Sequence, residues 1–387
     1  MARPLGIDQI GPDTPARDAA RAILAAKVQP LFDLEEAAAS GTDADAVHDM
    51  RVASRRVREA LRVFTPVYRK DAVREMDALA RAVTRALGTV RDADVLIGAL
   101  ERFASKAEDE SERAVLAYLI GYRRGVREAE LARMRRRLER LDLRDQRRRF
   151  ERALRDSRHS PQAGQPLARM AREVTKQRLD EFFDFLPAAL VPENIEAQHH
   201  MRIAGKHLRY AVETLSPCVV TDRYAELHST LVRYQDLLGE MHDCDVWTAY
   251  VMDVGLTPEA ARAGLGRAGV GALLEDISAR RRRYFDGFRE HLASFGEEAL
   301  RNSVVEALLD ETPEPAVVTT LVQPAEPGPL AMTADISLIP LPGPSAPRGR
   351  SMVAESVAPR EPVEPVGPAK QTPAQALGGT AGSGDAG

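Results

Sequence analysis

The chain of 387 residues is 44% hydrophobic and 29% charged, the composition of a water-soluble globular protein with room for two or three domains. It lacks the ~20-residue apolar run of a membrane span and an export-signal pattern, and two cysteines are too few for a disulfide framework, which together predict a cytoplasmic protein without membrane contact. The formal net charge of −4 argues against a general polyanion binder, and because residues 311–387 hold 8 acidic and 4 basic residues, the remainder is neutral and any basic site must be a local segregation of charge.

Helical patterns follow a flexible N-terminus, residues 1–15. Residues 16–38 and 112–141 place apolar side chains at three- and four-residue spacing, and they are rich in Ala, Leu, Glu and Arg. Between them, residues 46–66 read "AVHDMRVASRRVREALRVFTP", a histidine and five arginines in one helix-like run. Turn-forming residues predict breaks at 40–43, 65–68, 160–166, 190–194 and 256–260. The fold class predicted is all-α.

Residues 123–158 form the most basic segment of the chain, with 15 arginines and 7 acidic residues. Residues 279–285, "ARRRRYF", are similar. Two interpretations are equally favoured: a solvated helix face that pairs with its own acids, or a further phosphate-contact surface.

The second half of the body repeats the first. At an offset of 151 residues, "HDMRVASRRVREALRVFTP" (48–66) aligns with "HHMRIAGKHLRYAVETLSP" (199–217) without a gap. At the same offset "KVQPLFDL" (27–34) meets "RLDEFFDF" (178–185), and "LGTVRDADV" (87–95) meets "LGEMHDCDV" (238–246). Three blocks at one offset predict an internal duplication, with two pseudo-symmetric helical bundles over 16–160 and 166–300.

The chain ends in a proline-rich extension. Residues 311–387 contain 14 of the 25 prolines and no helical period, so they are predicted to form a disordered tail. The tail could tether the protein to a partner, whose identity the sequence does not indicate.

The repeated helix has two faces. At about 100° per residue, His48, Arg51, Arg55, Arg58 and Arg62 share an arc of about 80°. Met50, Val57, Leu61 and Phe64 lie opposite and are expected to face the core. The second copy places His199, Arg202, Lys206 and Arg209 on one stripe, with Met201, Leu208, Val212 and Leu215 opposite.

Like charges at three- and four-residue spacing repel, so each stripe needs compensation. Acidic residues of neighbouring helices could supply it, in particular Asp92, Asp94, Asp243 and Asp245 of the "RDAD" and "HDCD" segments, which would make the stripes structural. Alternatively the stripes bind an external polyanion. Because both copies keep the basic face, we favour the second interpretation, with the two faces lining one groove or channel.

The two histidine helices, each followed by "LG…RD" or "LG…HD", resemble the signature repeats of the CHAD family, the conserved histidine α-helical domain, over roughly residues 16–300. The resemblance implies an all-helical, pseudo-symmetric fold and a central basic pore or groove that binds inorganic polyphosphate without catalysis. The ExExK motif of the triphosphate-processing domains fused to some relatives is absent. A location at polyphosphate granules would suit such a protein.

The resemblance places the signature histidines on His48 and His199, and the basic positions on Arg51, Arg55, Arg56 and Arg58 and on Arg202, Lys206 and Arg209. His207 stands where the first repeat has Arg56. Arg62 shares the stripe, and Lys27 and Arg178, matched in the duplication, could add charge. Arginine forks suit phosphate independently of the family, and a nearby polyanion should raise a histidine's pKa. The complete predicted site is His48, Arg51, Arg55, Arg56, Arg58, Arg62, His199, Arg202, Lys206, His207, Arg209, Lys27 and Arg178.

Other functions have weaker signals. The "HD" pairs at His48 and His242 invite a metal phosphohydrolase, but guanidiniums around His48 would repel a cation, so neither metal nor cofactor is expected. The acids of "RDAD" and "HDCD" are expected to cap a helix after Gly88 and Gly239 and to orient the arginines. A nucleic-acid binder is disfavoured by the lack of an aromatic residue interleaved with the stripe. A scaffold with internally paired stripes stays open.

Overall fold

The computed structural model describes residues 6–41, 43–156, 160–219 and 221–309, and the predicted tail at 311–387 lies outside these ranges. Over the described ranges the chain is all-α: helices are joined by short turns and no β-strand forms. The prediction of an all-α fold is confirmed. No described helix is long and apolar enough to cross a lipid bilayer.

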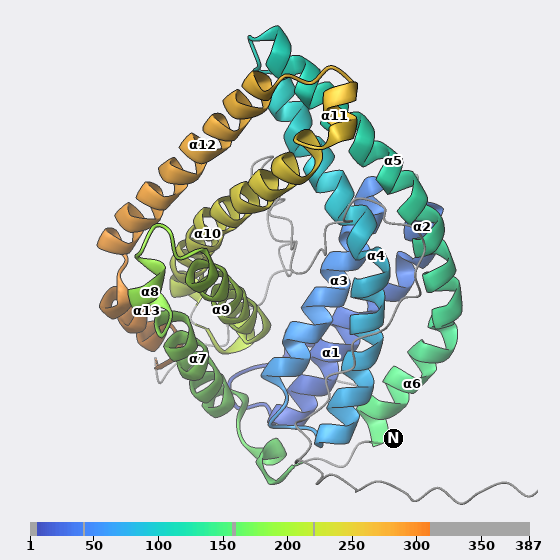
Figure 1. The fold of residues 1–387 in the computed structure, drawn as a ribbon. Coiled ribbons are helices and arrows are strands. Elements are labelled where there is room, and N and C mark those ends of the chain that lie inside the picture. Colours follow the sequence, from blue (N-terminus) through green and yellow to red (C-terminus); the bar gives the residue numbers. More distant parts are fainter. Residues whose placement is uncertain (1–5, 42, 157–159, 220, 310–387) are drawn as a thin grey trace, which may run out of the picture. The chain divides into compact units, whose positions relative to one another are not determined.

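Six α-helices precede residue 157. The helix bounds are α1 (Ala16–Asp33), α2 (Glu35–Ser40), α3 (Ala44–Val63), α4 (Lys70–Ala104), α5 (Glu110–Leu141) and α6 (Leu143–Asp156). A short 3-10 turn, Ile7–Gln9, comes first. Helices α3, α4 and α5 pack in sequence, and α5 and α6 run along the outer side of α4 (Figure 1).

The second set of helices follows the turn at Pro161–Gly164. Its bounds are α7 (Leu167–Phe183), α8 (Leu186–Ala189), α9 (Ile195–Thr214), α10 (Thr221–Gly255), α11 (Pro258–Arg262), α12 (Arg267–Ser294) and α13 (Glu297–Leu309), with a 3-10 turn at Ser216–Cys218. Helix α9 packs against α7 and α10, and α10 packs against α12, in the order in which α3 packs against α1 and α4, and α4 against α5.

The helix bounds repeat at the predicted spacing. Helices α3 and α9 begin and end 151 residues apart, and so do α4 and α10. Asp43 caps α3 and Asn194, 151 residues later, caps α9: each side-chain oxygen accepts hydrogen bonds from backbone N–H groups of the first turn. These repeated bounds are what a duplication predicts.

Two apolar clusters hold the helices together. The larger one contains the apolar backs of α3 and α9, so Met50 and Val57 are fully buried, as are Met201 and Leu208. The smaller one lies among α4, α5, α10 and α12 and therefore joins the two sets of helices. Trp247 and Cys244 belong to it, and Cys218 is also a buried thiol.

Three local expectations need revision. The helical run predicted at 16–38 breaks at Leu34, where the chain turns from α1 into α2 without a proline or glycine. The capping role predicted at Gly88 and Gly239 is wrong, because α4 and α10 continue through these positions as 35-residue helices. Residues 6–15, predicted to be flexible, contact the start of α7 through hydrogen bonds to the carbonyls of Pro12 and Thr14.

Candidate functional site

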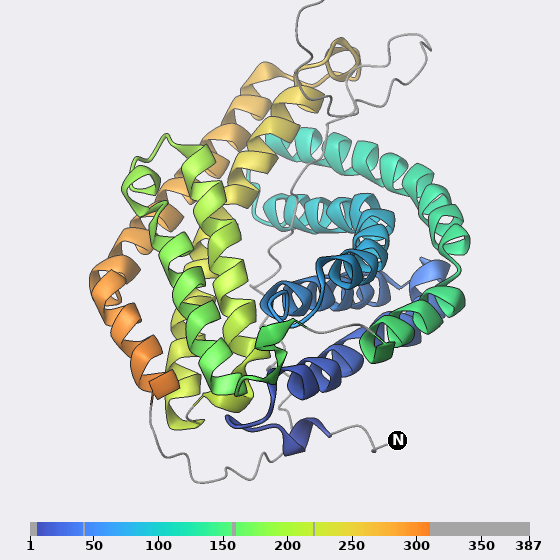
Figure 2. The same cartoon turned by 90° about the horizontal axis from the view of Figure 1, so that it is seen from below.

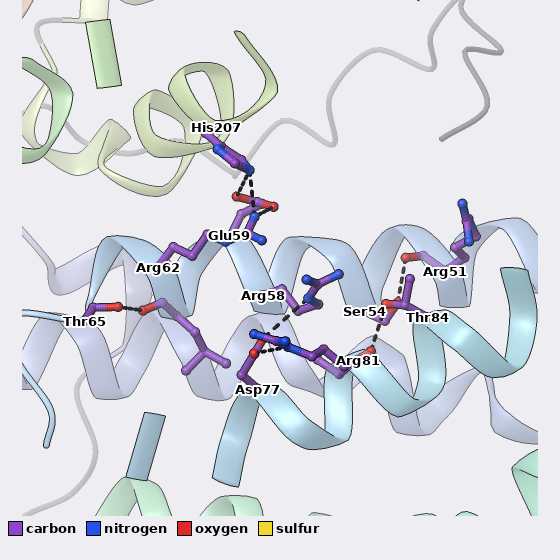
Figure 3. A network of polar contacts seen from close by, with 12 residues as sticks. Arg51, Ser54, Arg58, Glu59, Arg62, Thr65, Asp77, Arg81, Thr84 and His207 are labelled. Atoms are coloured by element: carbon purple, nitrogen blue, oxygen red, sulfur yellow. Dashed lines mark hydrogen bonds and ion pairs between the residues drawn. The ribbon is translucent and has the colours of Figure 1, made fainter. Parts of the chain in front are cut away.

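The predicted basic stripe of α3 divides into paired and unpaired cations. Arg51 Nη2 lies 3.4 Å from Asp92 Oδ1 of α4, and Arg58 Nε lies 3.3 Å from Asp77 Oδ1 of the same helix. Arg62 forms an ion pair with Glu59 one turn earlier (Figure 3). Part of this stripe is therefore neutralised internally, as the structural interpretation expected.

Arg55 and Arg56 differ from their neighbours. Neither guanidinium forms an ion pair with a residue in the described part of the chain, and Arg55 Nε, although buried, has no hydrogen-bond partner there. The Arg55 guanidinium lies over the ring of Tyr210, 5.4 Å from its centroid. A buried guanidinium nitrogen without an acceptor is costly unless a ligand completes its hydrogen bonds.

His48 lies among these arginines. Burial, followed by the charges of Arg91, Arg55, Arg51 and Arg56, lowers the pKa of His48 to about 4. The ring is therefore neutral at physiological pH. A group that resists protonation in part because cations surround it marks a region of positive potential.

The corresponding stripe of α9 is more deeply placed. The side chain of Arg202 is fully buried and Lys206 is 6% exposed. Arg209 Nε lies 3.5 Å from Glu213 Oε1 on the same helix. His199 Nδ1 lies 3.2 Å from His242 Nδ1 of α10, so one of these nitrogens donates and the other accepts.

Helices α3 and α9 contact each other through the stripes. Arg62 Nη1 donates to His207 Nε2 at 2.8 Å, and because arginine cannot accept, the His207 imidazole is neutral at this nitrogen. Burial lowers the pKa of His207, which favours the neutral imidazole. Tyr210, 3% exposed, has the guanidiniums of Arg55 and Arg209 near it, at 5.4 and 4.7 Å from its ring centroid. The two predicted faces thus meet.

Lys27 and Arg178 extend this region from α1 and α7. Burial lowers the pKa of Lys27; the charge of Glu213 opposes this shift and the charge of Arg56 adds to it. Arg178 Nη1 donates to Glu181 at 2.5 Å, and its charge acts on His207. The structure therefore brings both residues to the contact between α3 and α9.

The carboxylate Glu213 balances several of these cations. Burial by itself would raise the pKa of Glu213, but the hydrogen bond with His228 at 3.1 Å and the charges of Arg209 and Lys27 lower it overall. The site therefore carries its own anion at one end.

Sequence reasoning missed the residues that hold the basic helices in place. Arg127 of α5 pairs with Asp94 of α4 and donates to the carbonyl of Gly41, just before α3. Arg281 of α12 repeats the arrangement: it pairs with Asp245 of α10 and donates to the carbonyl of Pro192. The sequence signal was present, because both "D.D" segments occur at the 151-residue offset, and each is followed by an arginine-rich segment.

The second aspartate of each "D.D" segment therefore orients an arginine, as predicted, but the arginine belongs to the following helix. The first aspartate of one copy, Asp92, pairs with Arg51 of the basic helix. Its counterpart Asp243 is 2% exposed, as deeply buried as Arg202, the counterpart of Arg51.

The described residues contain no group of three or more histidine, cysteine, aspartate or glutamate side chains placed to hold a metal ion. The arrangement offers hydrogen-bond donation from guanidinium groups, and the neutral imidazoles of His48 and His207 lie next to them. That chemistry suits an oxyanion with several acceptor oxygens.

Comparison with known proteins identifies the family. The CHAD domain matches residues 22–252. The crystal structure of the CHAD domain from the plant Ricinus communis is 22% identical, with a TM-score of 0.57 over 76% of this chain and 96% of that one. PptA from Streptomyces chartreusis is 18% identical, with a TM-score of 0.46 over 72% of this chain and 100% of that one. No curated protein matches. Since the family match spans more than half of the sequence, the chain belongs to the CHAD family.

Proposed function

We propose that this protein binds inorganic polyphosphate, without catalysis, at the contact between α3 and α9. The observation that carries the proposal is the concentration of cationic charge around His48, where burial and the neighbouring arginines together lower the pKa to about 4. Arg55 and Arg56 in that cluster have no ion-pair partner in the described chain, so their charge is available to a ligand. Membership of the CHAD family supports the choice of ligand.

The chemistry of the ligand fits these groups. A linear polyphosphate offers anionic oxygens at short, regular intervals, and arginine presents a planar fork that binds phosphate oxygens in pairs. The aromatic residue at the site, Tyr210, is 3% exposed and has two guanidiniums near its ring, so it offers no surface for a nucleobase. We therefore favour polyphosphate over nucleic acid.

Ion pairs within the stripes favour a second candidate, a purely structural role. Arg51, Arg58 and Arg62 all have carboxylate partners, and so does Arg209. If every cation were balanced in this way, no polyanion would bind with steep salt dependence. Arg55 and Arg56 are the residues on which the two candidates differ.

The test is the binding of length-fractionated polyphosphate across a salt series by the wild type and by an Arg55→Gln/Arg56→Gln variant. We expect the variant to bind at least tenfold more weakly at low salt and to show a smaller salt slope, by about one unit for each phosphate group that it no longer neutralises. A double substitution of two exposed arginines on other helices, Arg102→Gln/Arg172→Gln, changes the net charge equally and should leave binding unchanged.

Three outcomes would contradict the proposal. Equal binding by the wild type and the Arg55/Arg56 variant would make the stripe structural. Complete competition by DNA of equal charge would favour a nucleic-acid backbone as the ligand. Release of orthophosphate from polyphosphate by the purified protein, absent in the Arg55/Arg56 variant, would show catalysis at this site.

A further inference from the structure

The arginine-rich segment of α5 and α6 is not part of the site described above, and its arginines fall into three groups. The first group is exposed and pairs with acidic residues: Arg124 with Glu101, Arg133 with Glu130, and Arg148 and Arg149 with Asp145. The second group is bonded to neighbouring helices or to the turn before α3. Arg127 pairs with Asp94, Arg135 donates to the carbonyls of Ala39 and Ser40, and Arg147 donates to Gln29. These side chains attach α5 and α6 to the helices beneath them.

The third group points to solvent and is unbonded. These side chains are exposed and form no hydrogen bond or ion pair with any residue that the structure describes. We call them the outer arginine face; they are Arg136, Arg137 and Arg140 of α5 and Arg144, Arg152 and Arg155 of α6. At about 100° per residue, the three on α5 span an arc of about 100° and the three on α6 an arc of about 80°. Both helices lie on the outside of α4 in two perpendicular views (Figures 1 and 2).

The duplication offers an internal comparison for this face. Arg147 of α6 bonds Gln29 and lies over Phe32, and Arg301 of α13 bonds Asp180 and lies over Phe183. These two arginines are 154 residues apart, whereas their partners keep the spacing of 151. The same spacing of 154 separates Arg127 of α5 from Arg281 of α12, so α6 corresponds to α13 in this register.

In that register α13 does not repeat the outer arginine face. Glu298 stands where α6 has Arg144, and Glu306 stands where it has Arg152. The inward arginine is kept in both copies, whereas two of the three outward arginines of α6 are replaced by acidic residues and the third, Arg155, by Leu309. The fold therefore does not require outward arginines, and the basic face belongs to the first half alone.

An exposed row of unpaired cations lowers the stability of its own helix through repulsion at three- and four-residue spacing. A ligand that bears several negative charges would offset this cost. Arginine, which occupies every position of the outer face, favours phosphate oxygens through paired hydrogen bonds. The aromatic residue of α6, Phe150, is 2% exposed, so the face has no platform for stacking a base. These features favour a phosphate polymer without bases.

We propose that the outer arginine face is a second binding surface for inorganic polyphosphate, distinct from the contact between α3 and α9. The choice of ligand rests on the proposed function, but the surface itself does not depend on the first site. Because its side chains are exposed, binding here is more sensitive to salt than binding among the buried groups of the first site.

The test uses the full chain and a short, length-fractionated polyphosphate, with the number of bound chains measured at low and at physiological salt. The variant is Arg136→Gln/Arg137→Gln/Arg140→Gln/Arg144→Gln. The matched control, Arg102→Gln/Arg172→Gln/Arg267→Gln/Arg289→Gln, removes the same charge from exposed arginines scattered over α4, α7 and α12. We expect two bound chains for the wild type and the control at low salt, and one for the outer-face variant.

Each outcome separates this inference from the proposed function. Two bound chains for the outer-face variant would overturn the inference and leave the proposed function intact. A single bound chain that survives Arg55→Gln/Arg56→Gln but not the outer-face substitutions would overturn the proposed function instead. If the outer-face variant lost DNA binding but kept both polyphosphate chains, the face would recognise nucleic acid and the inference would fail.

Discussion

Replacing Asp94 by asparagine should lower the free energy of unfolding by about 2 kcal/mol, because it removes the charge that balances Arg127. The pair joins α4 to α5, and the two side chains are 17% and 11% exposed for Arg127 and Asp94. Breaking a buried ion pair costs ~3–5 kcal/mol, whereas an exposed pair contributes ~0–1 kcal/mol. The residual exposure, and the oxygen that asparagine keeps as an acceptor, place the expected loss between these ranges.

The second half of the molecule supplies a matched variant, Asp245→Asn. Arg281 would keep hydrogen bonds to Gln198 Oε1 at 2.6 Å and to the carbonyl of Pro192 at 3.0 Å, whereas Arg127 would keep only the longer contacts, 3.4 Å each, to the carbonyl of Gly41 and to Glu128 Oε1. Burial also raises the pKa of Asp245 although Arg281 opposes the shift, so the folded state already holds this charge at a cost. We therefore expect a smaller loss, about 1 kcal/mol, from this substitution.

Urea unfolding of the wild type, the two variants and an exposed control, Asp286→Asn, measures these losses from the midpoint and slope of each transition. The expected order is Asp94→Asn, then Asp245→Asn, then the control, which should match the wild type. Losses below about 0.5 kcal/mol for both pairs would show that these contacts behave as surface ion pairs, and the reasoning would fail.

Three further predictions concern binding and the start of α3. The pKa of His48 is about 4 in the free protein, and a bound polyanion favours its protonated form, so polyphosphate affinity should rise as the pH falls from about 7 to about 5. Titration calorimetry in two buffers should show that protons are taken up on binding and that His48→Gln reduces this uptake. Glu59→Gln removes an internal anion and should raise polyphosphate affinity about fivefold at low salt, measured by fluorescence anisotropy; unchanged affinity would exclude competition by this carboxylate. Gly41→Ala should cost about 2 kcal/mol in urea unfolding, because φ is +61° and the added Cβ would lie 2.0 Å from Leu131 Cδ1; Gly264→Ala, at φ +86° in open space, should cost about 1 kcal/mol, and equal losses would refute the steric part.

The sequence was sufficient to predict the helices and the orientation of α3 and α9. Periodicity placed Met50 and Val57 on the buried face, and turn residues marked both ends of α3 and the start of α9, since these are local properties. The break at Leu34 was not predictable in this way because no proline or glycine marks it. A glycine in a helix was mistaken for an end at Gly88, where packing keeps α4 continuous.

The charge state of the predicted site could not be read from one helix. Counting cations on α3 treated Arg58 and Arg62 as equal to Arg55, but both of them have acidic partners. Asp77, the partner of Arg58, lies on α4, and Arg62 contacts Glu59 of α3 and His207 of α9. Packing between helices brings Asp77 and His207 there, which the helical period does not specify, whereas Glu59 could have been paired with Arg62 from their three-residue spacing. The prediction overstated the number of cations without an acidic partner on these helices.

In both halves a carboxylate pairs with the arginine at the same position of the stripe, but the carboxylate comes from a different helix in each half. In the first half Arg58 is balanced by Asp77 of α4. The residue 151 positions after Asp77 is His228, which cannot balance Arg209; instead Glu213, on α9 itself, lies 3.5 Å from Arg209 and 3.1 Å from His228. A carboxylate absent from one helix is thus replaced by one on its neighbour. Both halves therefore balance the arginine at this position of the stripe. Under the proposed function, the cations that contact the polyanion are Arg55 and Arg56, which have no ion-pair partner among the described residues and lie near His48.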